Sequence, residues 1–328
     1  MRARPLGRTG LTVSPIGLGL AALGRPAYID LGRAEDLGTD RDVEAMARRS
    51  HEVLDAAYAA GIRYVDAARS YGHAERFLAS WLAARPQAGD VTVGSKWGYT
   101  YVADWRTDVD VHEVKDHSVD ALRRQTAASL ALLEGRLDLY QIHSATLDSG
   151  VLDDRAVLAE LVRVADAHGL VIGLSVSGPQ QAGAIRRALE AEIDGVRPFR
   201  SVQATWNLLE PSVGPALADA HDEGWGVILK ESLANGRLAG RGDPSVVAEL
   251  EAVGQRHGGA SPDAVALAAA LAQPWVDVVL SGAVTTAQVR SNAAASELAL
   301  DPDDLHRLAG LAEASESYWT TRAELGWS

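Results

Sequence analysis

Apolar and polar positions repeat along the chain in two patterns that follow one another. Short runs rich in Val, Ile and Leu predict buried strands over 13–18, 62–66, 91–96, 137–143, 171–175, 199–203, 226–230 and 276–281. Between these runs, apolar residues at helical spacing predict amphipathic helices over 43–60, 73–84, 118–134, 154–168, 180–191, 212–221 and 262–272. Strands that alternate with helices predict a parallel sheet, and about eight such units favour a closed (β/α)8 barrel over an open doubly wound sheet.

The repeat runs through the chain without a break, which predicts a single domain over residues 1–328. No Pro- or Ser-rich linker and no low-complexity tract divides the chain. Two connections, 24–42 and 97–117, are long for loops, and the second contains several aromatic residues. Long aromatic loops on a barrel are where substrate pockets form, so we expect Trp97 and Tyr99 to line one.

The composition narrows the class of protein. The formal net charge is -13, from 44 acidic and 31 basic side chains, and such a surface repels the phosphate backbone of nucleic acids. The absence of cysteine excludes disulfides, thiolate metal sites and cysteine nucleophiles. Pro15 and several glycines break the apolar stretch near the N-terminus, and no apolar run reaches the roughly 20 residues of a membrane helix. We therefore expect a cytoplasmic protein that acts on a small molecule and binds neither nucleic acid nor a membrane. The sequence is silent on its oligomeric state.

Polar residues close most of the predicted strands. In chain order they are Asp66, Lys96, His143, Ser175, Gln203, Lys230 and Ser281. In a (β/α)8 barrel the carboxyl ends of the strands meet on one face, where barrel enzymes have their active sites. Each residue taken singly could be the first polar position of a loop. An acid, an amine and an imidazole on one face are less expected by chance, so we interpret Asp66, Lys96 and His143 as parts of one site.

Tyr71 follows the strand that ends at Asp66 and adds a proton donor to this set. A buried pair of Asp66 and Lys96 persists when each charge neutralises the other. A phenol has a reference pKa near ~10, and we expect the neighbouring ammonium to lower the pKa of Tyr71. His143 can hydrogen-bond a substrate oxygen or share the phenolic proton. The four residues predict general acid–base chemistry on a carbonyl or alcohol, with a separate cofactor supplying the redox chemistry.

Several motifs, in order, resemble the aldo-keto reductase family. They include VDAARSYGHAE (65–75), VGSKWG (93–98), LDLYQIH (137–143), GLSVSG (173–178), VQATWNLLE (202–210) and ANGRLAG (234–240). The resemblance covers almost the whole chain, from 4 to 295. It implies a (β/α)8 barrel that transfers hydride from a nicotinamide cofactor to an aldehyde or ketone. It also implies Tyr71 as general acid, Asp66 and Lys96 as the pair that tunes it, and His143 as the group that orients the carbonyl.

The resemblance further implies a cofactor site along the later strands. Its residues here are Ser175, Gln203, Lys230, Ser232, Leu233, Asn235, Gly236, Gly282, Gln288 and Asn292. Two positions depart from the family. Val176 replaces an asparagine that contacts the nicotinamide amide, and Lys230 stands where an aromatic ring often stacks on the nicotinamide. Either Trp206, also expected in the substrate pocket, stacks instead, or Lys230 contacts the cofactor in another way.

The positions expected to hold a cofactor 2′-phosphate are not basic in this chain. They are Gly282, Val284 and Gln288, with Arg290 as the nearby cation, although a phosphate prefers arginine or lysine. The helix N-terminus near Thr286 could assist. The resemblance favours NADPH, and these residues make NADH credible.

Other functions remain compatible with the residues. The same site could work oxidatively, as an NAD-linked sugar or alcohol dehydrogenase. Lys96 and Lys230 could serve a Schiff-base aldolase, although pairing with Asp66 makes Lys96 a poor nucleophile. The barrel could also be a non-catalytic, cofactor-binding redox-sensing subunit. No metal site is expected, because His112 and His117 lie five residues apart and would not share a helix face.

Overall fold

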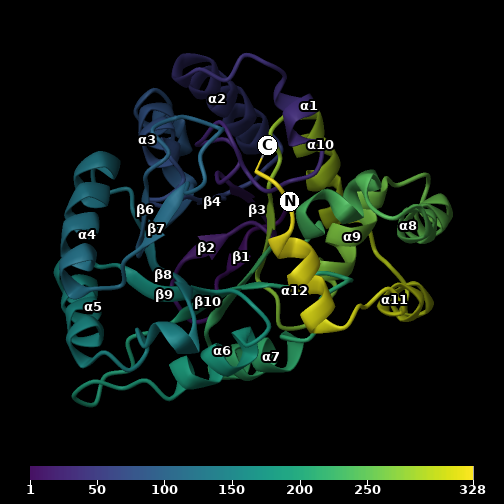
Figure 1. Cartoon of the computed structure of the whole chain (residues 1–328). Coiled ribbons are helices and arrows are strands. Elements are labelled where there is room, and N and C mark those ends of the chain that lie inside the picture. Colours follow the sequence, from purple (N-terminus) through teal and green to yellow (C-terminus); the bar gives the residue numbers. More distant parts are fainter. Residues whose placement is uncertain (328) are drawn as a thin grey trace.

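The computed structural model describes residues 1–327 and contains a closed parallel barrel at its centre. Eight strands form it in the order β10-β11-β12-β3-β4-β5-β8-β9, with helices around the outside (Figure 1). The strands are β3 (Ile16–Gly19), β4 (Tyr64–Asp66), β5 (Thr92–Trp97), β8 (Leu139–Ala145), β9 (Val171–Val176), β10 (Ser201–Thr205), β11 (Gly226–Lys230) and β12 (Val278–Ser281). The predicted (β/α)8 barrel is confirmed.

A helix follows each barrel strand. The helices are α2 (Val43–Ala59), α3 (Ala74–Ala83), α4 (Val119–Leu133), α5 (Arg155–His168), α6 (Gln181–Leu189), α7 (Gly214–Asp222), α9 (Pro262–Leu271) and α10 (Thr286–Ala294). Asp42, Ser118 and Asp154 cap α2, α4 and α5 by accepting hydrogen bonds from first-turn amides. These caps explain why the predicted boundaries agree with the structure within a few residues.

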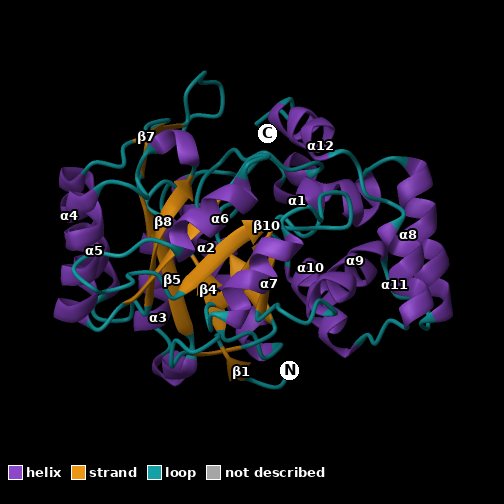
Figure 2. Ribbon diagram, turned by 90° about the horizontal axis from the view of Figure 1, so that it is seen from below, coloured by secondary structure: helices purple, strands orange, loops and turns teal. Residues whose placement is uncertain are grey.

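Within residues 1–327, four further helices lie outside the repeat of strand and helix, and the hydrophobic pattern does not predict them. They are α1 (Arg33–Leu37), α8 (Pro244–Arg256), α11 (Pro302–Ala309) and α12 (Ser315–Ala323). The connection predicted as the loop 97–117 contains an antiparallel pair, β6 (Tyr99–Tyr101) and β7 (Glu113–Lys115). In Figure 2, β7, α12 and the C-terminus lie at one end of the molecule, and β1 with the N-terminus lies at the other.

The predicted strand over 13–18 is wrong in its extent, because the structure divides it into two elements. Val13 belongs to a hairpin of β1 (Arg4–Pro5) and β2 (Thr12–Val13), and the barrel strand β3 begins at Ile16. Between them, Ser14 Oγ donates to the carbonyl oxygen of Ile16 at 2.6 Å and accepts from the amide of Arg63 at 2.7 Å. The buried side chains of the hairpin pack with Tyr64 in a cluster of their own, so the hairpin closes the amino-terminal end of the barrel.

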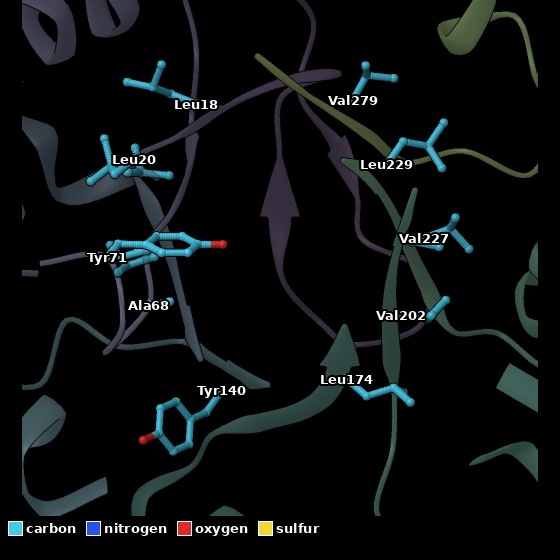
Figure 3. Packing of buried hydrophobic residues seen from close by; sticks show 14 of the residues in the cluster. Leu18, Leu20, Ala68, Tyr71, Tyr140, Leu174, Val202, Val227, Leu229 and Val279 are labelled. Carbon is cyan, nitrogen blue, oxygen red and sulfur yellow. The ribbon is translucent and has the colours of Figure 1, made fainter. Parts of the chain in front are cut away.

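Apolar side chains fill the space between barrel and helices in one large cluster. Figure 3 shows part of it, with Leu18, Val202, Leu229 and Val279 on barrel strands and Tyr71 between Leu20 and Ala68. No helix within residues 1–327 is long and apolar enough to cross a membrane. The same residues contain no group of three or more His, Cys, Asp and Glu side chains that could hold a metal ion.

Candidate active site

Asp66 and Lys96 form a buried ion pair at the carboxyl ends of the neighbouring strands β4 and β5. Lys96 Nζ also donates to the carbonyl oxygen of Ala67 at 3.0 Å. Asp66 Oδ1 accepts from Gln203 Nε2 at 2.9 Å and from the Tyr64 hydroxyl at 3.2 Å. These hydrogen bonds replace the ones that the Asp66 carboxylate would make to water, and they hold it next to Lys96.

Tyr71 is held over this pair by the close approach of two loops. A side chain at Gly24 would place its Cβ 2.2 Å from the carbonyl oxygen of Tyr71, and one at Gly72 would place it 2.4 Å from that of Gly24. Gly72 also has a φ of +57°, which glycine adopts without strain. The tyrosine hydroxyl lies 3.4 Å from Lys96 Nζ, and in Figure 3 it points away from Leu20 toward the barrel interior.

The structure corrects the expected direction of the Tyr71 pKa. Burial raises the pKa of Tyr71 well above its usual range, Asp66 adds to the rise, and Arg25 opposes it. Burial and the nearby Asp66 carboxylate outweigh the lowering expected from the Lys96 ammonium, which is itself paired with Asp66. Tyr71 is therefore a neutral phenol at pH 7, the form that a general acid needs.

His143, on β8, completes the group and is neutral. Its ring meets the Tyr71 ring edge to face, with centroids 5.4 Å apart, and its Nδ1 lies 3.3 Å from Ser70 Oγ. Burial, reinforced by Lys96 and Arg25, lowers the pKa of His143 well below its usual range. A neutral imidazole can donate one N–H to an oxygen in the site without adding charge.

A cleft of about 980 Å³ opens beside these residues. It is lined by Asp66, Tyr71 and His143, by Tyr99, and by nine of the predicted cofactor residues, namely Gln203, Lys230, Ser232, Leu233, Asn235, Gly236, Gly282, Gln288 and Asn292. Ser175 is the exception: it is buried next to the cleft, and its Oγ accepts from the amide of Ser144 at 2.9 Å. The structure thus brings the catalytic and most cofactor candidates to one site.

Two of the three residues predicted for the substrate pocket do not reach the cleft. Trp97 is fully buried, and its ring packs against His117 with centroids 5.7 Å apart. Trp206 packs edge to face against Trp275, with centroids 6.0 Å apart. Trp97 follows Lys96 on β5, and successive side chains of a strand point to opposite sides. Trp206 lies just after β10, and neither tryptophan lines the cleft. The proposal that Trp206 replaces the stacking ring is therefore wrong, and Tyr99 alone of the three lines the cleft.

Lys230 forms a hydrogen bond and an ion pair with neighbouring residues. Its Nζ donates to Thr205 Oγ1 at 2.7 Å and lies 3.7 Å from Glu231 Oε1. Glu231 in turn accepts from Arg322 Nε, on α12, at 2.7 Å. Burial lowers the pKa of Lys230 to about 8 against the opposing charge of Glu231. Burial alone would raise the pKa of Glu231, but Lys230 and Arg322 hold it at about 2. The lysine is therefore mainly an ammonium at pH 7.

A comparison with known proteins agrees with this geometry. A model of the aldo/keto reductase family matches residues 15–313. The chain belongs to the aldo/keto reductase family. An aldo-keto reductase of Strobilurus tenacellus is 26% identical to it, over 96% of this chain and 93% of that protein. An aryl-alcohol dehydrogenase (NADP(+)) of Phanerodontia chrysosporium is 27% identical, over 61% and 49% of the two chains. The holo form of an aldo-keto reductase from Bacillus halodurans has the same fold, with a TM-score of 0.72 at 22% identity over 97% of this chain and 99% of that one.

The cleft of this aldo/keto reductase has features that fit the nicotinamide cofactor of its family. Ser232 Oγ and Asn235 Oδ1 are buried and have no protein hydrogen-bond partner, and both residues line the cleft. Buried polar groups of folded proteins are usually satisfied, so such atoms indicate a polar ligand. The cleft volume is at the upper end of the range for small-molecule sites, which suits a dinucleotide together with a substrate.

Sequence reasoning missed Arg25, which lies against Tyr71, the predicted general acid. Its guanidinium carbon is 5.2 Å from the centre of the Tyr71 ring and 4.7 Å from that of Trp327. It donates to the carbonyl oxygen of Ser70 at 3.2 Å and to Glu113 Oε2 at 2.9 Å. Arg25 lies in a loop with no hydrophobic period, and its partners come from distant segments. No local sequence signal could have identified it.

Proposed function

We propose that this protein reduces an aldehyde or ketone to an alcohol, with Tyr71 as the proton donor. The observation that carries the proposal is the position of Lys96 Nζ, which pairs with Asp66 and lies 3.4 Å from the Tyr71 hydroxyl. Membership of the aldo/keto reductase family supports an oxidoreductase with a nicotinamide cofactor. The aryl-alcohol dehydrogenase among its relatives has NADP(+) in its name, which supports the same class of cofactor.

Each residue of the site has a separate role in the proposed reaction. A reduced nicotinamide, when bound, supplies the hydride that forms the new C–H bond. His143 donates an N–H to the carbonyl oxygen and orients it, without adding charge. Tyr71 transfers its phenolic proton to that oxygen as negative charge develops there, so that its O–H bond breaks as the alcohol O–H forms. Lys96 then stabilises the phenolate, and Asp66 holds Lys96 in position.

We propose that the cofactor lies along the residues that line the cleft after β10, β11 and β12. Ser232 and Asn235 offer unpartnered polar atoms, and Gly236, with a φ of +92°, lets the backbone turn close to the ligand. Gln203 is held by Asp66, so its amide is fixed in place for the nicotinamide. Lys230 contributes positive charge rather than a stacking ring. The resemblance favours NADPH as this cofactor.

A second candidate is the reverse reaction, an NAD(P)-linked alcohol or sugar dehydrogenase. The relative from Phanerodontia chrysosporium is named as a dehydrogenase. The same residues would serve, with the Tyr71 phenolate accepting the proton of the alcohol. Initial rates measured in both directions with both cofactors distinguish the two functions.

The direct test is Tyr71→Phe, assayed by the absorbance of the reduced nicotinamide against a panel of aldehydes and ketones. Loss of the phenolic proton should lower kcat by about 10²- to 10⁴-fold while cofactor binding is retained. Tyr58→Phe is the control, because the Tyr58 hydroxyl lies on α2 and donates to the carbonyl oxygen of Gln87, outside the cleft. Equal kcat in Tyr71→Phe and wild type would overturn the role of Tyr71. Cofactor binding without turnover of any substrate would favour the redox-sensing alternative.

A further inference from the structure

The segment that follows β3 forms one wall of the cleft at α10. Its short helix α1 lies beside α10 (Figure 1), and the two are joined by a hydrogen bond from Gln288 Nε2 to Asp36 Oδ2 of 2.7 Å. Asp36, Gln288 and Asn292 all line the cleft. The family resemblance places Gln288 at the cofactor 2′-phosphate and matches Asn292 to an asparagine that contacts the adenine, so both positions belong to the adenosine half of the cofactor. Asp36 therefore lies where the ribose of that half is expected, although it comes from a distant part of the sequence.

Gln288 is fixed in this position by its own helix. Its Oε1 accepts from the amides of Val284 at 2.9 Å and Thr285 at 3.2 Å, as one half of a capping box. The side-chain nitrogen is therefore the end that faces Asp36. The same bonds occupy two amides that precede α10, which reduces what this helix N-terminus can offer to a phosphate.

Arg241, a cation on the lining of the cleft, is already engaged by the Asp36 carboxylate. Arg241 pairs with Asp36 in a two-point contact, with nitrogen–oxygen distances of 2.7 and 2.9 Å, and also donates to the carbonyl oxygen of Leu31 at 3.0 Å. A second carboxylate lies nearby on the lining: Asp263 accepts from Asn292 Nδ2 at 2.7 Å. Arg290, expected from the sequence as the nearby cation, is exposed and is not among the residues that line the cleft.

The two forms of the cofactor differ at this wall by one phosphate group. NADPH would place a 2′-phosphate of nearly two negative charges against the Asp36 carboxylate, and that repulsion opposes binding. NADH has a 2′-hydroxyl there instead. A hydroxyl donates readily to a carboxylate, which is how acidic residues select NAD in dinucleotide-binding folds of another type.

We propose that Asp36, held by Gln288 and Arg241, is a specificity residue that makes this protein prefer NAD(H) to NADP(H). The inference rests on the proposed function, because it requires the cofactor to lie in this cleft. Asp36 accepts a hydrogen bond from the ribose 2′-hydroxyl, and Arg241 holds the carboxylate in place. The expectation of NADPH from family resemblance is thereby replaced by NADH for this chain.

Calorimetric titration with ADP-ribose and with its 2′-phosphorylated form tests the proposal, because these probes differ only by the phosphate. Wild type should bind ADP-ribose more tightly by about tenfold or more. Asp36→Asn should reduce that ratio by about tenfold, mainly by improving the phosphorylated probe. Gln288→Arg should also tighten the binding of the phosphorylated probe, because arginine can pair with phosphate. Glu35→Gln is the matched control: it removes one carboxylate from the same helix at an exposed position, and it should leave the ratio within about twofold.

Each contrary outcome has a separate meaning. Tighter binding of the phosphorylated probe by wild type would overturn the proposal, and its loss in Arg241→Gln would then identify Arg241 as the phosphate ligand. If Asp36→Asn and Glu35→Gln change the ratio of the two affinities equally, the effect comes from the net charge of the protein and not from the position of Asp36. That result would also overturn the proposal. If neither ADP-ribose, NADH nor NADPH binds the wild-type protein, the proposed function itself fails. Thermal melts of each variant show whether it is folded, and the wild-type ratio decides the preference even if Asp36→Asn unfolds.

Discussion

His117 illustrates how burial sets the charge of a single residue beside the active site. Its Nε2 lies 2.9 Å from the carbonyl oxygen of His143, and its Nδ1 is buried without a hydrogen-bond partner. Burial lowers its pKa from 6.5 to about 4, with the carbonyl of His143 opposing. Protonation would create a cation with nothing to accept its second N–H, so the folded protein resists it.

This shift predicts a loss of stability in mild acid. Between pH 6.5 and about 4, His117 binds a proton in the unfolded chain but not in the folded protein. The free energy of unfolding therefore rises with pH across this window. The stabilisation is complete above pH 6.5 and is lost as the pH falls toward 4. With a discount for partial exposure, His117 should account for about 1–2 kcal/mol of that loss.

Urea unfolding at several pH values checks the prediction. His117→Gln cannot titrate, and it should therefore lose less stability than wild type between pH 6.5 and 4.5. His168→Gln, at an exposed position on the last turn of α5, should follow the wild-type curve. Parallel curves for His117→Gln and wild type would show that other groups cause the acid sensitivity.

At the scale of elements, the loops after β3 and β4 position Tyr71, the proposed proton donor, through backbone contacts. The amide of His73 donates to the carbonyl oxygen of Gly24 at 2.7 Å, directly beside Tyr71. The contact depends on the missing side chain of Gly24, since a Cβ there would lie 2.5 Å from Ala74 Cβ as well as close to the Tyr71 carbonyl oxygen. The geometry of Tyr71 is therefore a property of two packed loops.

Gly24→Ala should move Tyr71 away from Lys96. We expect a loss of about 1–3 kcal/mol in stability, typical of overpacking, and a fall in kcat of about tenfold or more, because small displacements of catalytic groups are costly. Gly89→Ala is the control, because nothing lies within 4 Å of a Cβ at that position. Thermal denaturation and steady-state kinetics provide the two measurements. Unchanged kcat in a destabilised Gly24→Ala would mean that the loop contact serves folding alone.

At the scale of the whole molecule, the C-terminal segment is joined to the barrel by charge. Arg322 of α12 makes two hydrogen bonds to Glu231, which follows β11 directly. Trp327 stacks on His112, with ring centroids 4.1 Å apart, and lies at the cleft. Residues 91 positions apart (Arg322 and Glu231) and 215 positions apart (Trp327 and His112) thus meet beside the cleft.

Arg322→Met should weaken this junction by leaving Glu231 buried with Lys230 as its remaining cation. We expect a loss of about 2–4 kcal/mol, somewhat below the cost of breaking a fully buried pair, and faster hydrogen exchange in α12. Arg155→Met is the control, because its pair with Asp194 is exposed and should contribute about 0–1 kcal/mol. If both variants melt alike, the Arg322–Glu231 pair does not hold α12 in place.

The sequence by itself determined the barrel and the group that meets at its carboxyl end. Asp66, Lys96 and His143 close predicted strands, and parallel topology brings such ends together whatever the loops do. The roles assigned to these residues and to Tyr71 remain predictions, but the contacts between their side chains are those expected. Caps and glycines also carried local signals of where most helices of the repeat begin and end.

Only the tertiary structure decided the properties that depend on burial and on distant partners. The pKa of Tyr71 rises because the fold removes it from water and places the Asp66 carboxylate nearby. Trp97 and Trp206 turn away from the cleft because the core takes their side chains. Asp36 reaches Gln288 from 252 positions away. Hydrophobic periodicity reports which face of an element is buried, but it does not report which loops meet across a cleft, and those loops set the charge that a cofactor encounters.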